Sequence, residues 1–142
     1  MATPFSLIFE LFLQKVADYD LGGMIPEDMD YNMSRWLRSA CTKFSIDCKQ
    51  NVLDKSFITQ VFTADLTELE QEIVSGLMII EWLSPKINTS MLLKQSATDK
   101  DFKLYSQANH IDQLIKLRDS AQESVNSLIM RYSYQGALDD LV

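Results

Sequence analysis

The chain has 142 residues, which fits one domain that would bury roughly 70% of the surface its unfolded form exposes. A core of that size folds without disulfides or metal ions as staples. Twenty acidic and thirteen basic side chains give a net charge of −7, which argues against nonspecific binding to a phosphate backbone.

The cysteines and the N-terminal segment exclude further classes. Cys41 and Cys48 lie seven residues apart, a spacing that suits neither a zinc site nor a redox pair, so we expect reduced structural thiols. Met1 to Phe9 is apolar but lacks a basic leader, and Glu10 interrupts it well short of the 18 or so residues of a membrane span. We therefore expect a soluble protein without a secretory signal.

The first predicted helix starts at Thr3 and Pro4, a capping hydroxyl followed by a residue whose fixed φ suits a first helical turn. It ends between Asp18 and Gly23, where two glycines break the pattern. Its apolar stripe, at spacings of three and four residues, consists of Phe5, Ile8, Phe9, Phe12, Leu13 and Val16.

A second helix is predicted from Pro26, Glu27 and Asp28 to about Ser45, because the two carboxylates complement the positive end of the helix dipole. Its polar side is expected to be solvated and not to bind nucleic acid, although it carries Arg35, Arg38 and Lys43. Its buried face is predicted to be Met29, Met33, Trp36, Leu37, Ala40 and Phe44.

The helical period is lost between Asp47 and Ala64. Ser56 to Phe62 is rich in β-branched and aromatic residues, which favours a short extended piece or a hairpin arm. The alternative is an irregular loop that is anchored by Phe57, Val61 and Phe62.

The best-defined helix start is the pair Thr67 and Glu70, which has the spacing of a capping box. Ile73 to Leu83 follows as a helix that is apolar nearly all round, so it must be surrounded by other elements. A small domain has few helices for that purpose, and we therefore expect a subunit interface here. Gly76 would permit close approach of a neighbouring backbone, at about 1 kcal/mol of helix propensity.

Pro85 is expected to end or kink this helix, with a short fourth helix over Ile87 to Gln95. Thr98 or Asp99 would then cap a last helix from about Asp101 to Tyr134. Its apolar period lasts for about 45 Å, longer than so small a domain, so part of it should project or lie against a neighbour. The stripe is Phe102, Tyr105, Ala108, Ile111, Leu114, Ile115, Leu117, Ala121, Val125, Leu128, Ile129 and Tyr132.

The elements together predict an all-α fold, a small bundle of four to five helices with a long C-terminal helix and one irregular loop or short hairpin arm. Gly136 is expected to end the last helix. The helical domain would then cover residues 1–135, and residues 136–142 would form a tail that is disordered or docks on a partner.

The sequence offers little for catalysis. His110, the only histidine, is predicted in mid-helix at the boundary of a polar face, where a hydrogen-bonded structural role is expected. Asp99 and Asp101 flank Lys100, and their simplest role is charge at a helix N-terminus. We therefore expect no catalytic, metal or cofactor-binding residues and no enzyme activity.

Several short sequence segments are more specific than a helical pattern alone requires. They are Glu81 to Pro85 (EWLSP), Lys100 to Lys103 (KDFK), Ser106 to His110 (SQANH) and Arg131 to Tyr134 (RYSY), with Phe12-Leu13 and Asp18-Tyr19 near the N-terminus. With them, nearly the whole chain resembles the head-tail connector, or neck adaptor, proteins of tailed bacteriophages.

The resemblance implies a structural virion protein in the phage neck, assembled in the host cytoplasm. Its copies would form a ring, expected to be a dodecamer, that joins the portal of the DNA-filled head to the next neck or tail-completion protein. An acidic channel would let DNA pass without specific binding, since repulsion removes the counterion-release contribution. No membrane or cofactor is implied.

Two groups of residues are candidate contacts in such a ring. Tyr132, Tyr134, Leu138 and Leu141 are expected to be exposed anchors that dock on the portal or the next ring. Lys100, Asp101, Phe102 and Lys103 are expected at the contact between subunits, where the charges would pair, although capping and solvation also explain these charges.

The alternative function is that of a small cytosolic interaction module, a regulator or chaperone that binds a partner helix in a groove beside Trp36 and Trp82.

Overall fold

The computed structural model describes residues 2–18, 29–96 and 101–140. The described residues form four helices and a small three-stranded sheet, so the predicted all-α bundle is confirmed. The helices are α1 (Phe5–Asp18), α2 (Met29–Phe44), α3 (Glu68–Ser96) and α4 (Asp101–Asp140). The strands are β1 (Thr3–Pro4), β2 (Lys55–Ser56) and β3 (Val61–Phe62).

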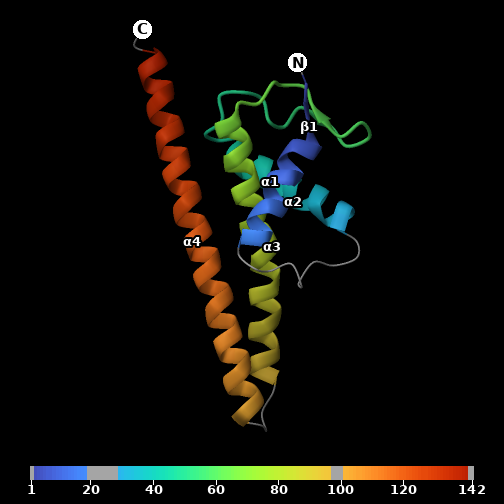
Figure 1. The fold of residues 1–142 in the computed structure, drawn as a ribbon, viewed down its shortest axis with the longest axis vertical. Coiled ribbons are helices and arrows are strands. Elements are labelled where there is room, and N and C mark those ends of the chain that lie inside the picture. The colour runs from blue at the N-terminus through green and yellow to red at the C-terminus, as the bar shows by residue number, and fades with distance from the viewer. Residues whose placement is uncertain (1, 19–28, 97–100, 141–142) are drawn as a thin grey trace.

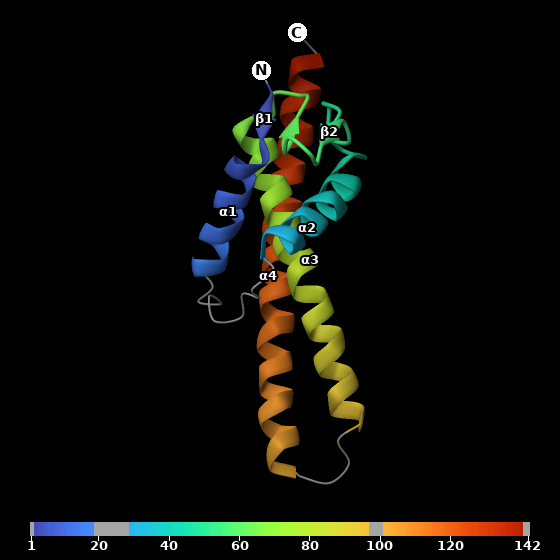
Figure 2. The same ribbon diagram turned by 90° about the vertical axis from the view of Figure 1, so that its right-hand side faces the viewer.

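The two long helices, α3 and α4, lie side by side as an antiparallel hairpin (Figure 1). Figures 1 and 2 show α1 and α2 packed beside the half of this hairpin that contains the start of α3 and the end of α4. The other half extends beyond them. At 1.5 Å per residue, the 40 residues of α4 are about 60 Å long, so the predicted projection of this helix is confirmed.

The first half of α3 is the centre of the core. Every residue from 73 to 83 is buried except Glu81, which is half-buried and pairs with Lys43 of α2. Helices α1, α2 and α4 of the same chain all pack against α3. The expectation that Ile73 to Leu83 lies at a subunit interface is therefore wrong, because one copy already surrounds this segment.

Among the residues whose side chains the structure describes, one member of the predicted helix stripes is exposed. Leu13 is 39% exposed and points away from the core, whereas Phe5, Ile8, Phe12 and Val16 are fully buried. In the described parts of α2 and α4, the buried side chains are Met33, Leu37, Ala40, Cys41, Phe44, Ile111, Leu114, Ala121, Val125 and Tyr132.

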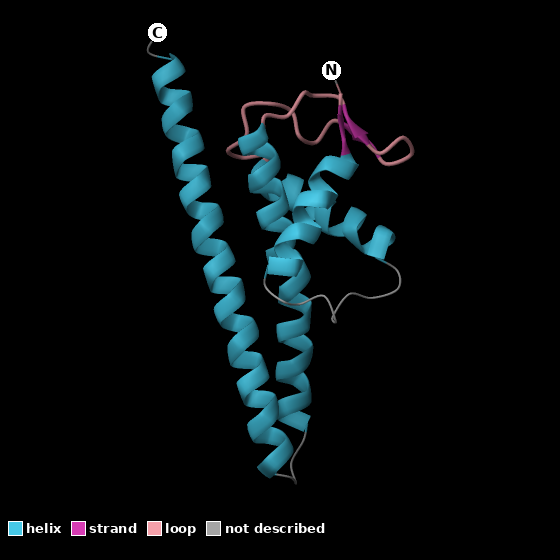
Figure 3. Cartoon of the chain, viewed as in Figure 1, coloured by secondary structure: helices cyan, strands magenta, loops and turns pink. Residues whose placement is uncertain are grey.

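Thr3 does not cap α1. It belongs to β1, which pairs antiparallel with β3, and its buried hydroxyl accepts a hydrogen bond of 2.8 Å from the backbone N–H of Leu66. The strand β2 pairs with the other edge of β3, so the predicted hairpin arm between Ser56 and Phe62 is confirmed. Figure 3 shows this sheet at the N-terminal end of the bundle.

Pro85 neither ends α3 nor begins a separate helix, and the expected fourth helix at Ile87 is part of α3. Leu83 and Ile87, on either side of the proline, are both buried. This packing outweighs the hydrogen bond that the proline removes, a cost of about 3 kcal/mol. The expected caps of α4, Thr98 and Asp99, lie outside the described residues.

Gly136 does not end α4, which continues to Asp140. Residues 137–140 of the predicted tail are therefore helical. A glycine inside a helix costs about 1 kcal/mol, which a helix of this length tolerates. The residues on both sides of Gly136, including Tyr134 and Leu138, thus belong to one continuous helix.

Gly76 lies where α3 and α4 approach each other closely. A Cβ atom built on Gly76 would be 2.6 Å from Cγ2 of Val125, a buried side chain of α4. No ordinary van der Waals contact is that short. Val125 is β-branched and has essentially one χ1 rotamer in a helix, so it has little freedom to move aside.

We expect Gly76→Ala to lower the free energy of unfolding by about 1–3 kcal/mol, since overpacking exceeds the gain in helix propensity. Gly136→Ala is the matched control. Its Cβ would meet only the end of the Lys49 side chain, which can move, so the variant should keep a gain of up to about 1 kcal/mol. Urea denaturation of both variants tests this expectation, and a Gly76→Ala variant as stable as the parent would contradict it.

Candidate functional site

A buried carboxylate, Glu70, organises the polar contacts at the N-terminal end of α3. Its Oε1 accepts hydrogen bonds from the backbone N–H of Thr67 (2.8 Å) and from Gln50 Nε2 (2.6 Å). Its Oε2 accepts from the Tyr132 hydroxyl (2.8 Å) and from the Cys48 thiol (3.2 Å). The N–H of Glu70 in turn donates to Oγ1 of Thr67 at 3.2 Å, so the predicted capping box is confirmed.

The cluster joins three parts of the chain. Gln50 and Cys48 belong to the segment after α2, Glu70 to α3 and Tyr132 to α4. The Tyr132 hydroxyl also accepts a hydrogen bond of 2.8 Å from the backbone N–H of Lys49. These hydrogen bonds connect three segments that are distant in sequence, which is typical of a structural cluster.

The electrostatics of Glu70 agree with a structural role. Burial by itself would raise the pKa of this carboxyl, but hydrogen bonds from Thr67, Tyr132, Cys48 and Gln50 outweigh it, and the net pKa is lowered. Glu70 is thus held as a carboxylate at neutral pH. Burial and the hydrogen bond to this carboxylate raise the pKa of the Tyr132 hydroxyl, which stays protonated and donates.

Both cysteines are free thiols. Burial raises the pKa of Cys41 to about 11. Burial and the hydrogen bond to Glu70 together raise the pKa of Cys48 to about 11. Because the thiolate is the nucleophile and metal ligand, neither cysteine is activated at neutral pH.

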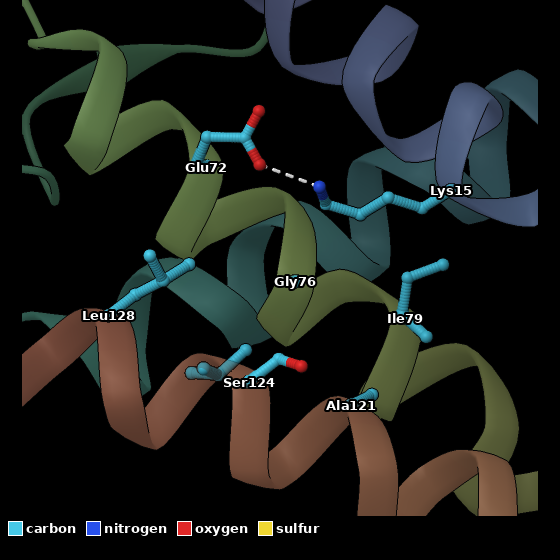
Figure 4. A pocket seen from close by; sticks show the side chains of 8 residues that line it. Lys15, Glu72, Gly76, Ile79, Ala121, Ser124 and Leu128 are labelled. Atoms are coloured by element: carbon cyan, nitrogen blue, oxygen red, sulfur yellow. Dashed lines mark hydrogen bonds and ion pairs between the residues drawn. The ribbon is translucent and has the colours of Figure 1, made fainter. Parts of the chain in front are cut away.

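Several grooves lie on the described surface of the bundle. The first, which we call the Gly76 groove, separates α1, α3 and α4 and has a volume of about 340 Å³. Figure 4 shows Gly76, Ala121 and Ser124 along its floor, and the ion pair between Lys15 Nζ and Glu72 Oε2, 2.6 Å long, at its rim. Its lining offers few polar groups with which to orient a small substrate.

The second groove, the α1–α3 groove, has a volume of about 520 Å³. It runs between α1 and the start of α3. Its apolar side chains are Leu7, Leu11 and Leu69, and its charged ones are Glu10, Glu68 and Glu72. The groove thus combines three leucine side chains with three carboxylates, and Gln14 and Gln71 complete its lining.

A third groove lies beside Trp36 and Trp82, as the interaction-module alternative expects, and has a volume of about 320 Å³. The indole N–H of Trp82 is buried and has no hydrogen-bond partner among the described residues. The two indole rings and Phe12 form one aromatic cluster, with centroid separations of 5.5 to 6.3 Å.

The four predicted docking residues have different outcomes. Tyr132 is wrong as an exposed anchor, because it is only 7% exposed and its ring packs edge-on against Phe44. Tyr134 and Leu138 are exposed on α4, at 69% and 60%. Leu141 lies outside the described residues.

The predicted subunit contacts lie at the far end of the α3–α4 hairpin. Asp101, Phe102 and Lys103 form the first turn of α4, and their side chains are outside the described part of the chain, as is the whole of Lys100. His110 also belongs to α4, with its side chain outside that part. The structure therefore leaves their proposed roles as predictions.

Sequence reasoning missed Met130, which is 63% exposed one helical turn before Tyr134. The signal was present, since Met130, Tyr134 and Leu138 recur every four residues and share one face of a helix. This short exposed repeat was overlooked because the longer apolar stripe that ends at Tyr132 covers the same part of the helix.

Within the described ranges, no group of three or more histidine, cysteine, aspartate or glutamate side chains is placed to hold a metal ion. Among the described helices, none has the length and apolar character needed to cross a membrane. Comparisons with protein-family models, curated proteins and solved structures found no match.

We expect Tyr132→Phe to lower the free energy of unfolding by about 1–3 kcal/mol, because the Lys49 N–H and Glu70 Oε2 each lose a partner inside the protein. Tyr134→Phe removes the same hydroxyl from an exposed ring and should change stability by less than about 0.5 kcal/mol. Equal losses in a denaturant titration would show that the buried cluster contributes nothing particular.

The lowered pKa of Glu70 also predicts a pH dependence. A carboxyl whose pKa is lower in the folded than in the unfolded state stabilises the fold above the unfolded pKa, and this stabilisation is lost as pH falls through the folded pKa. The stability difference between the parent and Glu70→Gln should therefore shrink between about pH 5 and pH 2. A difference that stays constant over this range, measured by urea denaturation, would contradict the assignment.

Proposed function

We propose that this protein is a structural subunit of a tailed-bacteriophage neck, a head-tail connector whose copies form a ring below the portal and extend the DNA channel toward the tail. The proposal rests on the resemblance described above. It is supported by the way the chain distributes its apolar surface.

The observation that carries the proposal is the α3–α4 hairpin. Of the segments behind the resemblance, those at residues 81–85, 106–110 and 131–134 lie on these two helices, and residues 101–103 are the start of α4. The hairpin also extends beyond α1 and α2 (Figure 2). A long hairpin on a small closed bundle offers lateral surface for packing side by side with copies of the chain.

The chemistry of the described residues favours a structural role over catalysis. The carboxylate of Glu70 is saturated with hydrogen bonds, and both thiols have raised pKa values. The net charge of −7 supports a channel that DNA passes without binding. In this proposal, Tyr134 and Leu138 supply contact surface to a neighbour, and Lys100 to Lys103 lie between subunits.

The groove beside Trp36 and Trp82 favours a second candidate, a helical module that binds a partner helix. Its specific support is the groove itself, about 320 Å³ in volume and lined by both tryptophans. Such a module would act as a monomer or dimer.

Light scattering separates the two candidates. The connector proposal expects the purified chain to form a high-mass assembly, either alone at high concentration or when the portal protein of the same phage is added. A monomer or dimer under both conditions, with no binding to the portal, would overturn it in favour of the module.

A further inference from the structure

The C-terminal half of α4 exposes an apolar stripe, formed by Met130, Tyr134 and Leu138. These residues are 63%, 69% and 60% exposed, and their spacing places them on one side of the helix. Val125 and Tyr132 face the core from the opposite side. The α4 stripe therefore points away from α3.

One charge accompanies this stripe. Arg131 is exposed and lies three residues before Tyr134 and seven before Leu138, which places it on the same side of α4. It is the only charged residue between Ser124 and Leu138. The α4 stripe is thus apolar with a single positive charge.

The α1–α3 groove has the complementary character. Leu7, Leu11 and Leu69 give it an apolar lining, and Leu7 is 43% exposed. Glu10 and Glu68 on its rim are both exposed, and no basic residue lines it. The groove therefore complements the α4 stripe. Both surfaces carry apolar side chains, and their charges have opposite signs.

The two surfaces lie at the same level of the molecule. The hydrogen bond of 2.8 Å between the Tyr132 hydroxyl and Glu70 Oε2 fixes the stripe-bearing part of α4 beside the start of α3. The groove includes residues 68–72 of that same start. Both surfaces are thus at the bundle end of the hairpin, near the chain's C-terminus in Figure 1.

We propose that the α4 stripe of one copy docks in the α1–α3 groove of the next copy, with Arg131 facing Glu10 and Glu68. This inference rests on the ring-forming function proposed above. Two different surfaces make a heterologous contact, in which each copy uses its stripe on one neighbour and its groove on the other. Both surfaces lie at the same position along the axis of the α3–α4 hairpin. Copies joined in this way can therefore close into a ring, because no shift along that axis is needed between neighbours, whereas a shift would give a helical filament.

Charge reversal tests the pairing. Arg131→Glu sets acidic groups against the acidic rim, and Glu10→Arg sets basic groups against Arg131. Each variant alone is expected to associate about tenfold or more weakly than the unsubstituted chain. An equimolar mixture of the two variants should recover association, because opposite charges then face each other at both kinds of contact. Sedimentation velocity, under the conditions in which the unsubstituted chain assembles, measures all of these samples.

The Glu10→Arg variant alone identifies the partner surface. If the stripe instead packed on the stripe of another copy, Glu10→Arg would assemble like the unsubstituted chain, because its own stripe is unchanged. Arg38→Glu and Asp47→Arg make the same charge changes at exposed positions in and just after α2, and both should assemble like the parent. Circular dichroism checks that every variant is folded.

The outcomes separate this inference from the proposed function. If the unsubstituted chain assembles but Arg131→Glu assembles equally well, or the mixture stays dissociated, the stripe–groove contact is wrong and the ring proposal stands. If the unsubstituted chain does not assemble either alone or with portal protein, the ring proposal fails and the contact fails with it.

Discussion

The rest of the structure depends on one constraint, the burial of a helix that is apolar on every side. The segment from Ile73 to Leu83 has almost no polar face to present to water, so three other helices must cover it. This requirement brings α1 and α2 to the same half of α3 and draws the C-terminal half of α4 alongside. The Glu70 cluster then joins α4 to the loop after α2. Part of the apolar surface that remains exposed lies on the outer side of α4, at Met130, Tyr134 and Leu138.

Much of the fold could be predicted from local patterns. The capping box at Thr67 and Glu70, the buried stripes and the hairpin arm each depend on residues close in sequence. The predictions were wrong where contacts between residues far apart in the sequence determine the local structure. Packing on both sides of Pro85 keeps α3 continuous, and a hydrogen bond across 63 residues takes Thr3 away from its capping role. No pattern within a short window contains that information.

The candidate contact surfaces could be predicted only in part. Sequence periodicity placed Tyr132, and not Tyr134, in the apolar stripe of the last helix, but the docking prediction treated both tyrosines as exposed anchors. Glu70, which is distant in sequence, binds the Tyr132 hydroxyl and holds that ring inward. The α1–α3 groove could not be predicted at all, since it exists only where two separate helices diverge. The acidic character of its rim follows from the same arrangement.

The aromatic cluster of Phe12, Trp36 and Trp82 has a spectroscopic consequence. Both tryptophans of the chain lie at the junction of α1, α2 and α3, with ring centroids 6.3 Å apart, and neither belongs to α4. Intrinsic fluorescence therefore follows the release of α1 and α2 from α3. The ring contacts of both indoles are with side chains of α1, α2 and α3, so their emission reports chiefly on the packing of these three helices. A comparison of tryptophan emission with helical ellipticity would thus resolve whether the two halves of the core come apart together or in turn.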